Sequence, residues 1–309
     1  MPRGLIRRLL TALPSGNPLT LVDVGSMGGL ETDWAWLKEE GLLKSVGFEP
    51  DDREFAKLRS DDRTVFHPCA LSDRPGRALE LFVAREPGKT SLFKPNMELL
   101  RRFPKPERFE TVRAVALPAD RVRTLDEVVP AADFIKLDTQ GSELSILQGG
   151  PKLLDGVLGL KVEVEFLELY HGQPLFADVD AFLRAKGFEL ADLRRVYWKR
   201  AEFTAYPGKG QLVFGDALYF KNADAFPKEK ALQFAAVCLL YGMRDMAAAA
   251  CLQAGLKDFH AEILASAPSY GAGLPGRNRL IRWMRDLSRL IGRSDQGFSD
   301  ADAGLGNGG

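Results

Sequence analysis

The fold is decided by residues 19–29, LTLVDVGSMGG, in which an apolar run passes into a turn that holds three glycines. The run predicts a short buried strand, and the apolar residues Leu30, Trp34 and Leu37 follow at helical spacing. A strand, a glycine-rich turn and a helix form the first unit of an open α/β sheet, whose ligands bind beyond the carboxyl ends of the strands. The turn is therefore predicted to hold a cofactor.

The alternation of strands and helices continues to about residue 222. Strands are predicted at 44–50, 78–84, 133–138 and 158–166, and a strand with its following loop at 64–73. Helices are predicted at 51–58, 121–129, 142–150 and 179–186. Residues 84–111, rich in Pro, Lys and Arg, are interpreted as a long irregular insertion. The segments 188–193 and 215–222 are predicted to form a terminal antiparallel pair. The expected fold is a Rossmann-like, doubly wound α/β domain with a mainly parallel sheet and a terminal antiparallel strand.

Helical segments flank this domain of residues 1–222. Residues 3–13 form an amphipathic pattern that is predicted to cap the domain. Residues 223–293 are expected to be a C-terminal α-helical extension, with a helical hairpin around Gly242 and a basic amphipathic helix at 277–293. Residues 294–309 have the composition of a disordered tail.

The composition is that of an ordinary globular protein. The 309 residues carry 42 basic and 42 acidic side chains, so the formal net charge is zero. The whole chain therefore exerts no long-range electrostatic attraction on nucleic acid. Three cysteines without CxxC spacing argue against a disulfide framework and against a cysteine-based zinc site. No segment reads as a signal peptide or a membrane span, so a cytoplasmic location is expected.

The residues of the turn indicate which class of cofactor it binds. Met27 stands where the GxGxxG dinucleotide fingerprint has its second glycine, and Asp23 would repel a pyrophosphate, so NAD is disfavoured. The cationic, amino-acid-bearing S-adenosylmethionine suits that carboxylate better. Glu49, at the end of the second strand, can accept hydrogen bonds from both ribose hydroxyls.

Several further motifs are similar to those of the FkbM family of class I S-adenosylmethionine-dependent methyltransferases. The resemblance is carried, in family order, by LVDVGSMGG, VGFEPD, CALSD, the SL of GKTSLF, RTLDEV, DFIKLDTQGSELSILQGG and KVEVEF. The chain departs from the family at Ser26 and Met27, where Ala-Asn is usual. It departs again at Thr139 and Gln140, where an acidic residue often precedes the glycine.

The resemblance implies a set of cofactor contacts. Asp23, Gly25, Ser26 and Gly28 would surround the methionine moiety, and Glu49 would bind the ribose. Three residues of the CALSD motif would meet the adenine, and Asp138 would face the methyl group. These three are Ala70, Leu71 and Asp73.

Methyl transfer to a hydroxyl benefits from a general base, and three residues are candidates for catalysis. Asp138 ends a strand whose carboxyl edge faces the crevice, and Glu165 lies near the end of the following strand. His171, in the loop after that strand, can titrate near neutrality and is weighed equally as a surface or substrate contact. Glu143 is expected to support the loop instead. A divalent metal held by Asp138, Glu165 and His171 is conceivable, but no ligand-spacing motif supports it, so no metal is predicted.

The leading hypothesis is an O-methyltransferase acting on a hydroxyl of a sugar, a glycan or another secondary metabolite. The alternatives are a polyketide, lipid or peptide acceptor, or a non-catalytic scaffold of the same fold. The expected partner is a small-molecule or glycan acceptor, and no nucleic acid is expected. The basic helices leave open peripheral contact with an anionic membrane, although packing or a homodimer is favoured.

Overall fold

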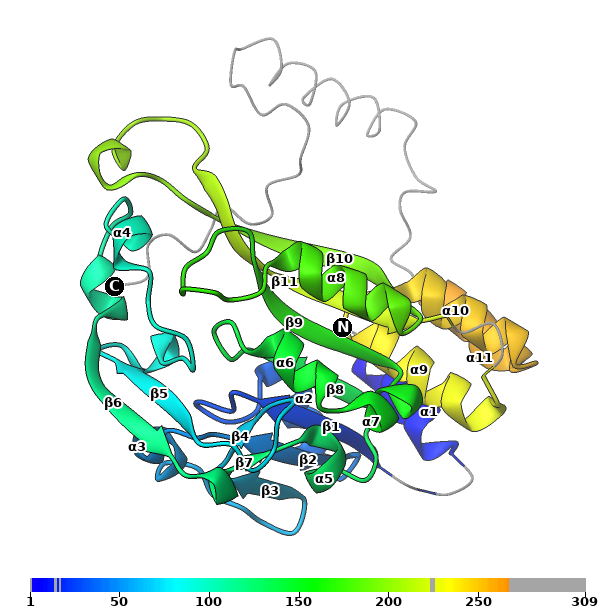
Figure 1. The fold of residues 1–309 in the computed structure, drawn as a ribbon. Coiled ribbons are helices and arrows are strands. Elements are labelled where there is room, and N and C mark those ends of the chain that lie inside the picture. Colours follow the sequence, from blue (N-terminus) through cyan, green and yellow to red (C-terminus); the bar gives the residue numbers. More distant parts are fainter. Residues whose placement is uncertain (1, 14–15, 17, 223–225, 267–309) are drawn as a thin grey trace.

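The computed structural model describes all residues except 1, 14–15, 17, 223–225 and 267–309. The described residues form a seven-stranded sheet of order β10-β11-β9-β8-β1-β2-β3 (Figure 1). Its strands are β1 (Leu19–Val24), β2 (Leu43–Phe48), β3 (Thr64–His67), β8 (Phe134–Leu137), β9 (Gly159–Glu165), β10 (Phe188–Trp198) and β11 (Gln211–Lys221). The first five are parallel, whereas β11 runs antiparallel to both β9 and β10. The predicted Rossmann-like sheet and its terminal antiparallel pair are confirmed.

The register brings the ends of the central strands to one edge. Val24 of β1 pairs with Phe48 of β2 on one side and with Leu137 of β8 on the other. The next residue of each strand, Gly25, Glu49 and Asp138, therefore leaves the sheet on one line. This edge is where an open α/β sheet binds its ligand.

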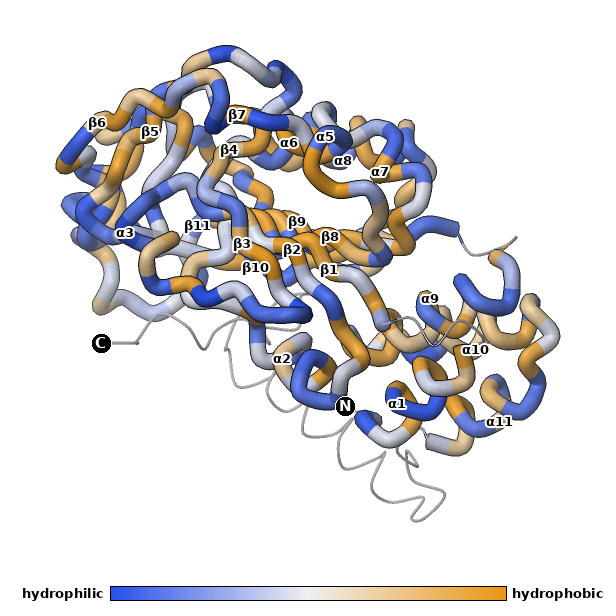
Figure 2. The backbone as a smooth tube through the Cα atoms, turned by 90° about the horizontal axis from the view of Figure 1, so that it is seen from below, coloured by the Kyte–Doolittle hydropathy of each residue, from blue (hydrophilic) through white to orange (hydrophobic). Residues whose placement is uncertain are grey.

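Helices cover both faces of the sheet, which forms the middle layer in Figure 2. One face packs against α5 (Leu125–Val128), α6 (Glu143–Gln148), α7 (Pro151–Gly156) and α8 (Phe176–Ala185). The other face packs against α1 (Arg3–Thr11), α2 (Thr32–Glu39), α9 (Lys228–Leu240), α10 (Arg244–Gln253) and α11 (Lys257–Ala265). On each side of the sheet, strand and helix residues form one continuous apolar cluster. The burial of this apolar surface is the driving force for the layered packing.

The helices at the two ends of the described chain belong to this second layer. The apolar side of α1 is buried, and its exposed residues Arg7 and Arg8 pair with Glu40 and Glu262. The predicted cap at 3–13 and the predicted hairpin around Gly242 are confirmed, and α11 adds a helix that was not predicted. The basic helix at 277–293 and the tail at 294–309 lie outside the described residues. Within the described part of the chain, no helix has the length and apolar character needed to cross a membrane.

Two small sheets stand apart from the main one. The predicted strand at 78–84 forms β5 (Leu79–Ala84), which pairs with β6 (Thr111–Leu117) rather than with the main sheet. Between them the predicted insertion contains η1 (Pro87–Lys89), α4 (Met97–Leu100) and η2 (Pro106–Phe109). The remaining short elements are α3 (Asp52–Phe55), β4 (Ala70–Leu71), η3 (Ala119–Arg121), β7 (Val122–Arg123) and η4 (Ala201–Phe203).

The helix predicted at 121–129 is shorter than expected. Val122–Arg123 is a strand, β7, that pairs with β4, and the helix α5 begins only at Leu125. Thr124 accounts for this boundary because its side chain accepts a hydrogen bond from the Glu127 backbone while the Glu127 carboxylate caps Thr124 in return. A capping box of this kind starts a helix and leaves the preceding residues extended.

Candidate functional site

The glycine turn after β1 is held against the ends of two neighbouring strands. Gly25 has a φ of +77°, and a Cβ there would lie 2.0 Å from the Asp138 carbonyl oxygen, so only glycine fits. The backbone N–H groups of Gly25 and Ser26 both donate to the Phe48 carbonyl. The Ser26 hydroxyl donates to the Asp23 carbonyl at 2.6 Å and accepts from the Phe48 N–H at 3.0 Å. Both hydrogen bonds of this hydroxyl therefore hold the turn in its conformation against β2.

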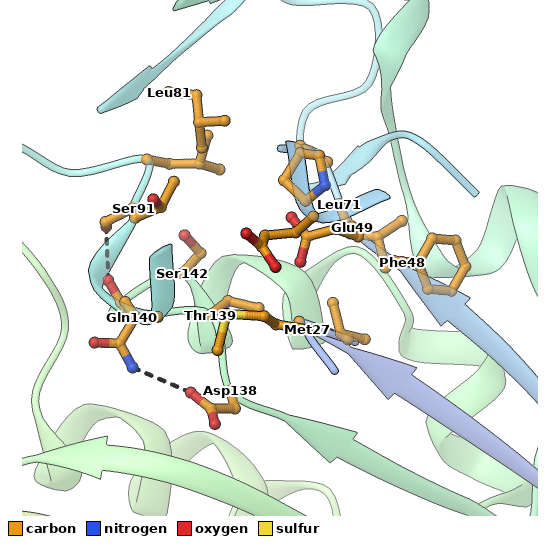
Figure 3. A pocket seen from close by; sticks show the side chains of 18 of the residues that line it. Met27, Phe48, Glu49, Leu71, Leu81, Ser91, Asp138, Thr139, Gln140 and Ser142 are labelled. Atoms are coloured by element: carbon orange, nitrogen blue, oxygen red, sulfur yellow. Dashed lines mark hydrogen bonds between the residues drawn. The ribbon is translucent and has the colours of Figure 1, made fainter. Parts of the chain in front are cut away.

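A cavity of about 300 Å³ opens at this edge of the sheet (Figure 3). Its size lies at the lower end of the range for small-molecule sites. One part is apolar, with Phe48, Leu71 and Ile146 among its walls. The opposite part is polar, and the insertion residues 86–92 close it from above. The remaining lining residues include Gly25, Met27, Glu49, Pro50, Cys69, Ala70, Lys136, Asp138, Thr139, Gln140, Ser142 and Glu163.

Glu49 places a buried carboxyl group in the wall of the cavity. Its Oε1 accepts a hydrogen bond from the Asp51 N–H at 2.8 Å, and only 7% of the residue is exposed. Burial raises the pKa of Glu49 to about 7 because the charged form loses its hydration. A hydroxyl donor in the cavity would restore that lost hydrogen bonding to the charged form.

An ion pair lies beneath the first turn. The Lys136 Nζ is 3.1 Å from Asp23 Oδ1 and donates to the Gly25 carbonyl at 3.0 Å. Burial raises the pKa of Asp23 to about 6, although the Lys136 charge opposes this shift. Lys136 lines the cavity, whereas Asp23 does not. The charge of Asp23 is therefore paired with a cation that borders the site.

The polar end of the cavity gathers carboxyl groups around one amide. Gln140 Nε2 donates to Asp138 Oδ1 at 3.1 Å and to Glu163 Oε1 at 2.5 Å, and the Tyr170 hydroxyl lies 3.0 Å from Gln140 Oε1. Burial, together with the neighbouring Asp138 carboxylate, raises the pKa of Glu163 well above its ordinary value. Figure 3 shows Asp138 and Gln140 linked at this end.

The loop between β8 and α6 is held by Glu143. Its Oε1 accepts hydrogen bonds from the Thr139 N–H and hydroxyl, at 2.6 and 2.9 Å, and its Oε2 accepts from the Gly141 N–H at 2.9 Å. Ser91 of the insertion donates to the Gln140 carbonyl at 2.7 Å. The expected supporting role of Glu143 agrees with these contacts, and the loop carrying Gln140 is rigidly placed.

Five of the residues predicted from the sequence line the cavity, and the others do not. The lining members are Gly25, Glu49, Ala70, Leu71 and Asp138. Asp23 and Ser26 support the turn from below, and Gly28 lies on its exposed side. Asp73 does not line the cavity, and its carboxylate accepts a hydrogen bond from Ser145 Oγ at 2.7 Å.

The two further catalytic candidates also lie outside the cavity lining. Glu165 is buried beside Gln173, and one of its oxygens has no hydrogen-bond partner. His171 is exposed, and its backbone N–H is fixed by the Lys94 carbonyl. The catalytic roles predicted for these two residues stay predictions.

Glu163 occupies the place that was predicted for Glu165. Leu137 of β8 pairs with Val162 of β9, so Glu163 is level with Asp138 and Glu165 lies two residues further on. Strand β9 extends this far because β11 pairs with it up to Glu165. The sequence did hold a sign that Glu163 could reach the site. In KVEVEF the residues Lys161, Glu163 and Glu165 alternate with apolar ones, so all three side chains lie on one face of the strand. No cluster of metal-ligating side chains is present in the described residues.

Comparison with known proteins assigns the family. A model of the methyltransferase FkbM domain matches residues 23–190. The chain belongs to the FkbM methyltransferase family. The FkbM domain match includes the glycine turn, Glu49, the loop after β8 and strand β9, which are the parts that build the cavity, and it excludes α1 and α9–α11. The protein is thus a methyltransferase, as its sequence motifs indicated.

Individual relatives of this FkbM methyltransferase are distant. The 2-O-methyltransferase NoeI of Sinorhizobium fredii (strain NBRC 101917 / NGR234) is 27% identical over 184 residues, which cover 56% of this chain and 74% of that protein. Precorrin-6y C5,15-methyltransferase from Geobacter metallireducens GS-15 is 11% identical at a TM-score of 0.33, over 71% of this chain and 87% of that one. TYW2 of M. jannaschii, solved in complex with AdoMet, is 12% identical at a TM-score of 0.30, over 71% and 76% of the two chains.

Proposed function

We propose that this FkbM methyltransferase is an O-methyltransferase that binds S-adenosylmethionine in the cavity and methylates a hydroxyl of a sugar, a glycan or another metabolite. The observation that carries the proposal is the division of the cavity. A buried carboxyl and an apolar slot lie at one end, and a carboxyl cluster lies at the other. The name of the relative NoeI, a 2-O-methyltransferase, supports the oxygen acceptor.

The residues present fit the cofactor. Glu49 supplies a carboxylate for the ribose hydroxyls, and Phe48, Leu71 and Ile146 supply apolar walls for an adenine ring. Ser142 also lines the cavity, and its buried hydroxyl has no hydrogen-bond partner among the residues that the structure describes. A buried polar atom without a partner is costly, so a ligand heteroatom at this position would be favoured.

The chemistry is divided between cofactor and chain. When bound, S-adenosylmethionine supplies a methyl group activated by its sulfonium. Asp138, which lines the polar end of the cavity, would accept the proton that the acceptor hydroxyl releases. A carboxylate base of this kind contributes roughly 10²- to 10⁴-fold to the rate.

The proposal is tested by following transfer of a radiolabelled methyl group to a panel of alkyl glycosides, with an alkylamine as the competing acceptor. We expect label in a glycoside, and we expect Asp138→Asn to lower the turnover about 10²-fold or more while S-adenosylhomocysteine still binds. An exposed carboxyl in β5, Glu80, supplies the control variant Glu80→Gln. Label that appears only in the amine would overturn the assignment of an oxygen acceptor.

A further inference from the structure

Gln140 holds an unusual position in the loop after β8. Its φ is +59°, a left-handed conformation that side-chain-bearing residues rarely adopt, and 6% of the residue is exposed. The loop is nevertheless firmly placed by Glu143 and by the Ser91 hydroxyl. A strained residue that its surroundings hold so tightly points to a role at the site.

Every polar atom of the Gln140 side chain has a partner. The amide nitrogen uses its two hydrogens on two different carboxyl groups, Asp138 and Glu163. The amide oxygen faces the Tyr170 hydroxyl, whose hydrogen is shared with the Lys89 carbonyl at 3.1 Å. Because Tyr170 has a hydrogen to give and the carboxylates accept, only one orientation of the amide satisfies all partners.

The amide joins two carboxyl groups whose charges repel each other. Asp138 and Glu163 both line the polar end of the cavity, and Glu163 is almost fully buried. Further charged and titratable groups act on Glu163 from the neighbouring elements: Lys89, Glu143, Glu165 and Tyr170. Lys89 is the cation among them that counteracts the raised pKa of Glu163. Two carboxyl groups in such a setting retain a proton that isolated carboxylates would release.

We propose that Gln140 is a positioning residue whose two amide hydrogens hold the Asp138 and Glu163 carboxyl groups together, with one proton retained by the pair, so that a single negative charge faces the methyl-transfer end of the cavity. This inference rests on the proposed function. A third carboxylate at position 140, the residue type that the FkbM family often has there, would remove both donors and add a further charge. The neutral amide instead donates a hydrogen bond to each carboxyl group and adds no charge.

The charge of the pair can be measured without knowing the acceptor. S-adenosylmethionine carries a sulfonium, and S-adenosylhomocysteine has nearly the same shape with a neutral sulfur. The ratio of their dissociation constants therefore reports the charge near the sulfur, and a change in packing alone affects both ligands alike. Below the pKa of Glu163 the pair carries one negative charge. Above it the pair carries two, so the preference for the sulfonium rises with pH.

The experiment is calorimetric titration of the full-length protein with each ligand over the pH range in which the protein stays folded. For the wild type we expect the preference for S-adenosylmethionine to rise by roughly tenfold across the transition. Glu163→Gln should lose the larger part of this pH dependence, and the remainder comes from Asp23 and Glu49, whose pKa values are about 6 and about 7. Gln140→Glu should move the transition upward by at least about one pH unit, since the charged form loses its donors. Gln148→Glu, the same change on the exposed end of α6, should leave the transition in place.

The outcomes separate this inference from the proposed function. Folded protein that binds neither ligand would contradict the proposed function. Binding of both ligands with a flat preference in the wild type, or with a transition that Gln140→Glu leaves unmoved, would overturn only the role of Gln140. If Gln140→Glu does not fold, the comparison of wild type with Glu163→Gln decides, because a pH dependence that persists undiminished in that variant would refute the proton retained by the pair.

Discussion

Replacing Glu49 by glutamine is expected to stabilise the folded protein at pH 8 while weakening cofactor binding. The pKa of Glu49 rises from an ordinary 4.5 to about 7 on folding because the carboxyl is buried. The difference of about 2.5 units corresponds to roughly 3 kcal/mol, at about 1.4 kcal/mol for each unit. The glutamine oxygen can still accept the hydrogen bond from the Asp51 N–H, so the variant mainly removes the cost of burying a charge.

The pH dependence has a definite sign. Below pH 4.5 the carboxyl is protonated in both the folded and the unfolded chain, so Glu49 costs no stability there. Between pH 4.5 and about 7 the unfolded chain releases the proton before the folded chain does, and stability is lost progressively. Glu49→Gln should therefore gain little at pH 5 and nearly the full 3 kcal/mol, as an order of magnitude, at pH 8.

The assay is urea unfolding followed by circular dichroism at pH 5 and pH 8, with Glu80→Gln as a control for charge removal at the surface. Calorimetric titration with S-adenosylhomocysteine on the same samples should show binding weakened by about tenfold or more, since charge-assisted hydrogen bonds contribute roughly 1.5–3 kcal/mol each. An equal stability gain at both pH values, or none at pH 8, would refute the assigned burial of a charged carboxyl.

Three further variants test the parts that support the site. Gly25→Ala should lower the free energy of unfolding by at least about 3 kcal/mol in urea titrations, because a Cβ would meet the Asp138 carbonyl at 2.0 Å. Glu143→Ala should cost roughly 1–3 kcal/mol for each N–H that it leaves unpaired, seen as a lower melting temperature. Phe234→Ala, which empties a buried position of α9 against Phe220, should cost about 3–5 kcal/mol if α9 is integral to the fold. Unchanged unfolding of any of these would contradict the contact concerned.

The parts of the fold predicted from the sequence are those with local signals. The apolar run before Gly25 and the helical spacing after it define the first strand, turn and helix without any tertiary information. Asp138 and Glu49 could be placed at the site because parallel strands present their carboxyl ends at one edge. Both residues line the cavity in the structure.

The parts that were missed depend on pairing between distant segments. The choice between Glu163 and Glu165 requires the register of β9 against β8, and β9 reaches Glu165 only through its antiparallel partner β11. The segment at 78–84 alternates like a strand of the main sheet, yet it pairs with residues 111–117 across the insertion. The contacts of Gln140 with Tyr170 and Glu163 likewise join parts of the chain that no local pattern connects.

The most direct test of the account is calorimetric titration of the wild-type protein with S-adenosylhomocysteine, with NADH as the control ligand and Glu49→Ala in parallel. Saturable binding of S-adenosylhomocysteine alone, abolished or strongly weakened in Glu49→Ala, is the predicted result. A folded wild-type protein that does not bind S-adenosylhomocysteine, or a Glu49→Ala variant that binds it as tightly as the wild type, would contradict the assignment of this cavity as the cofactor site.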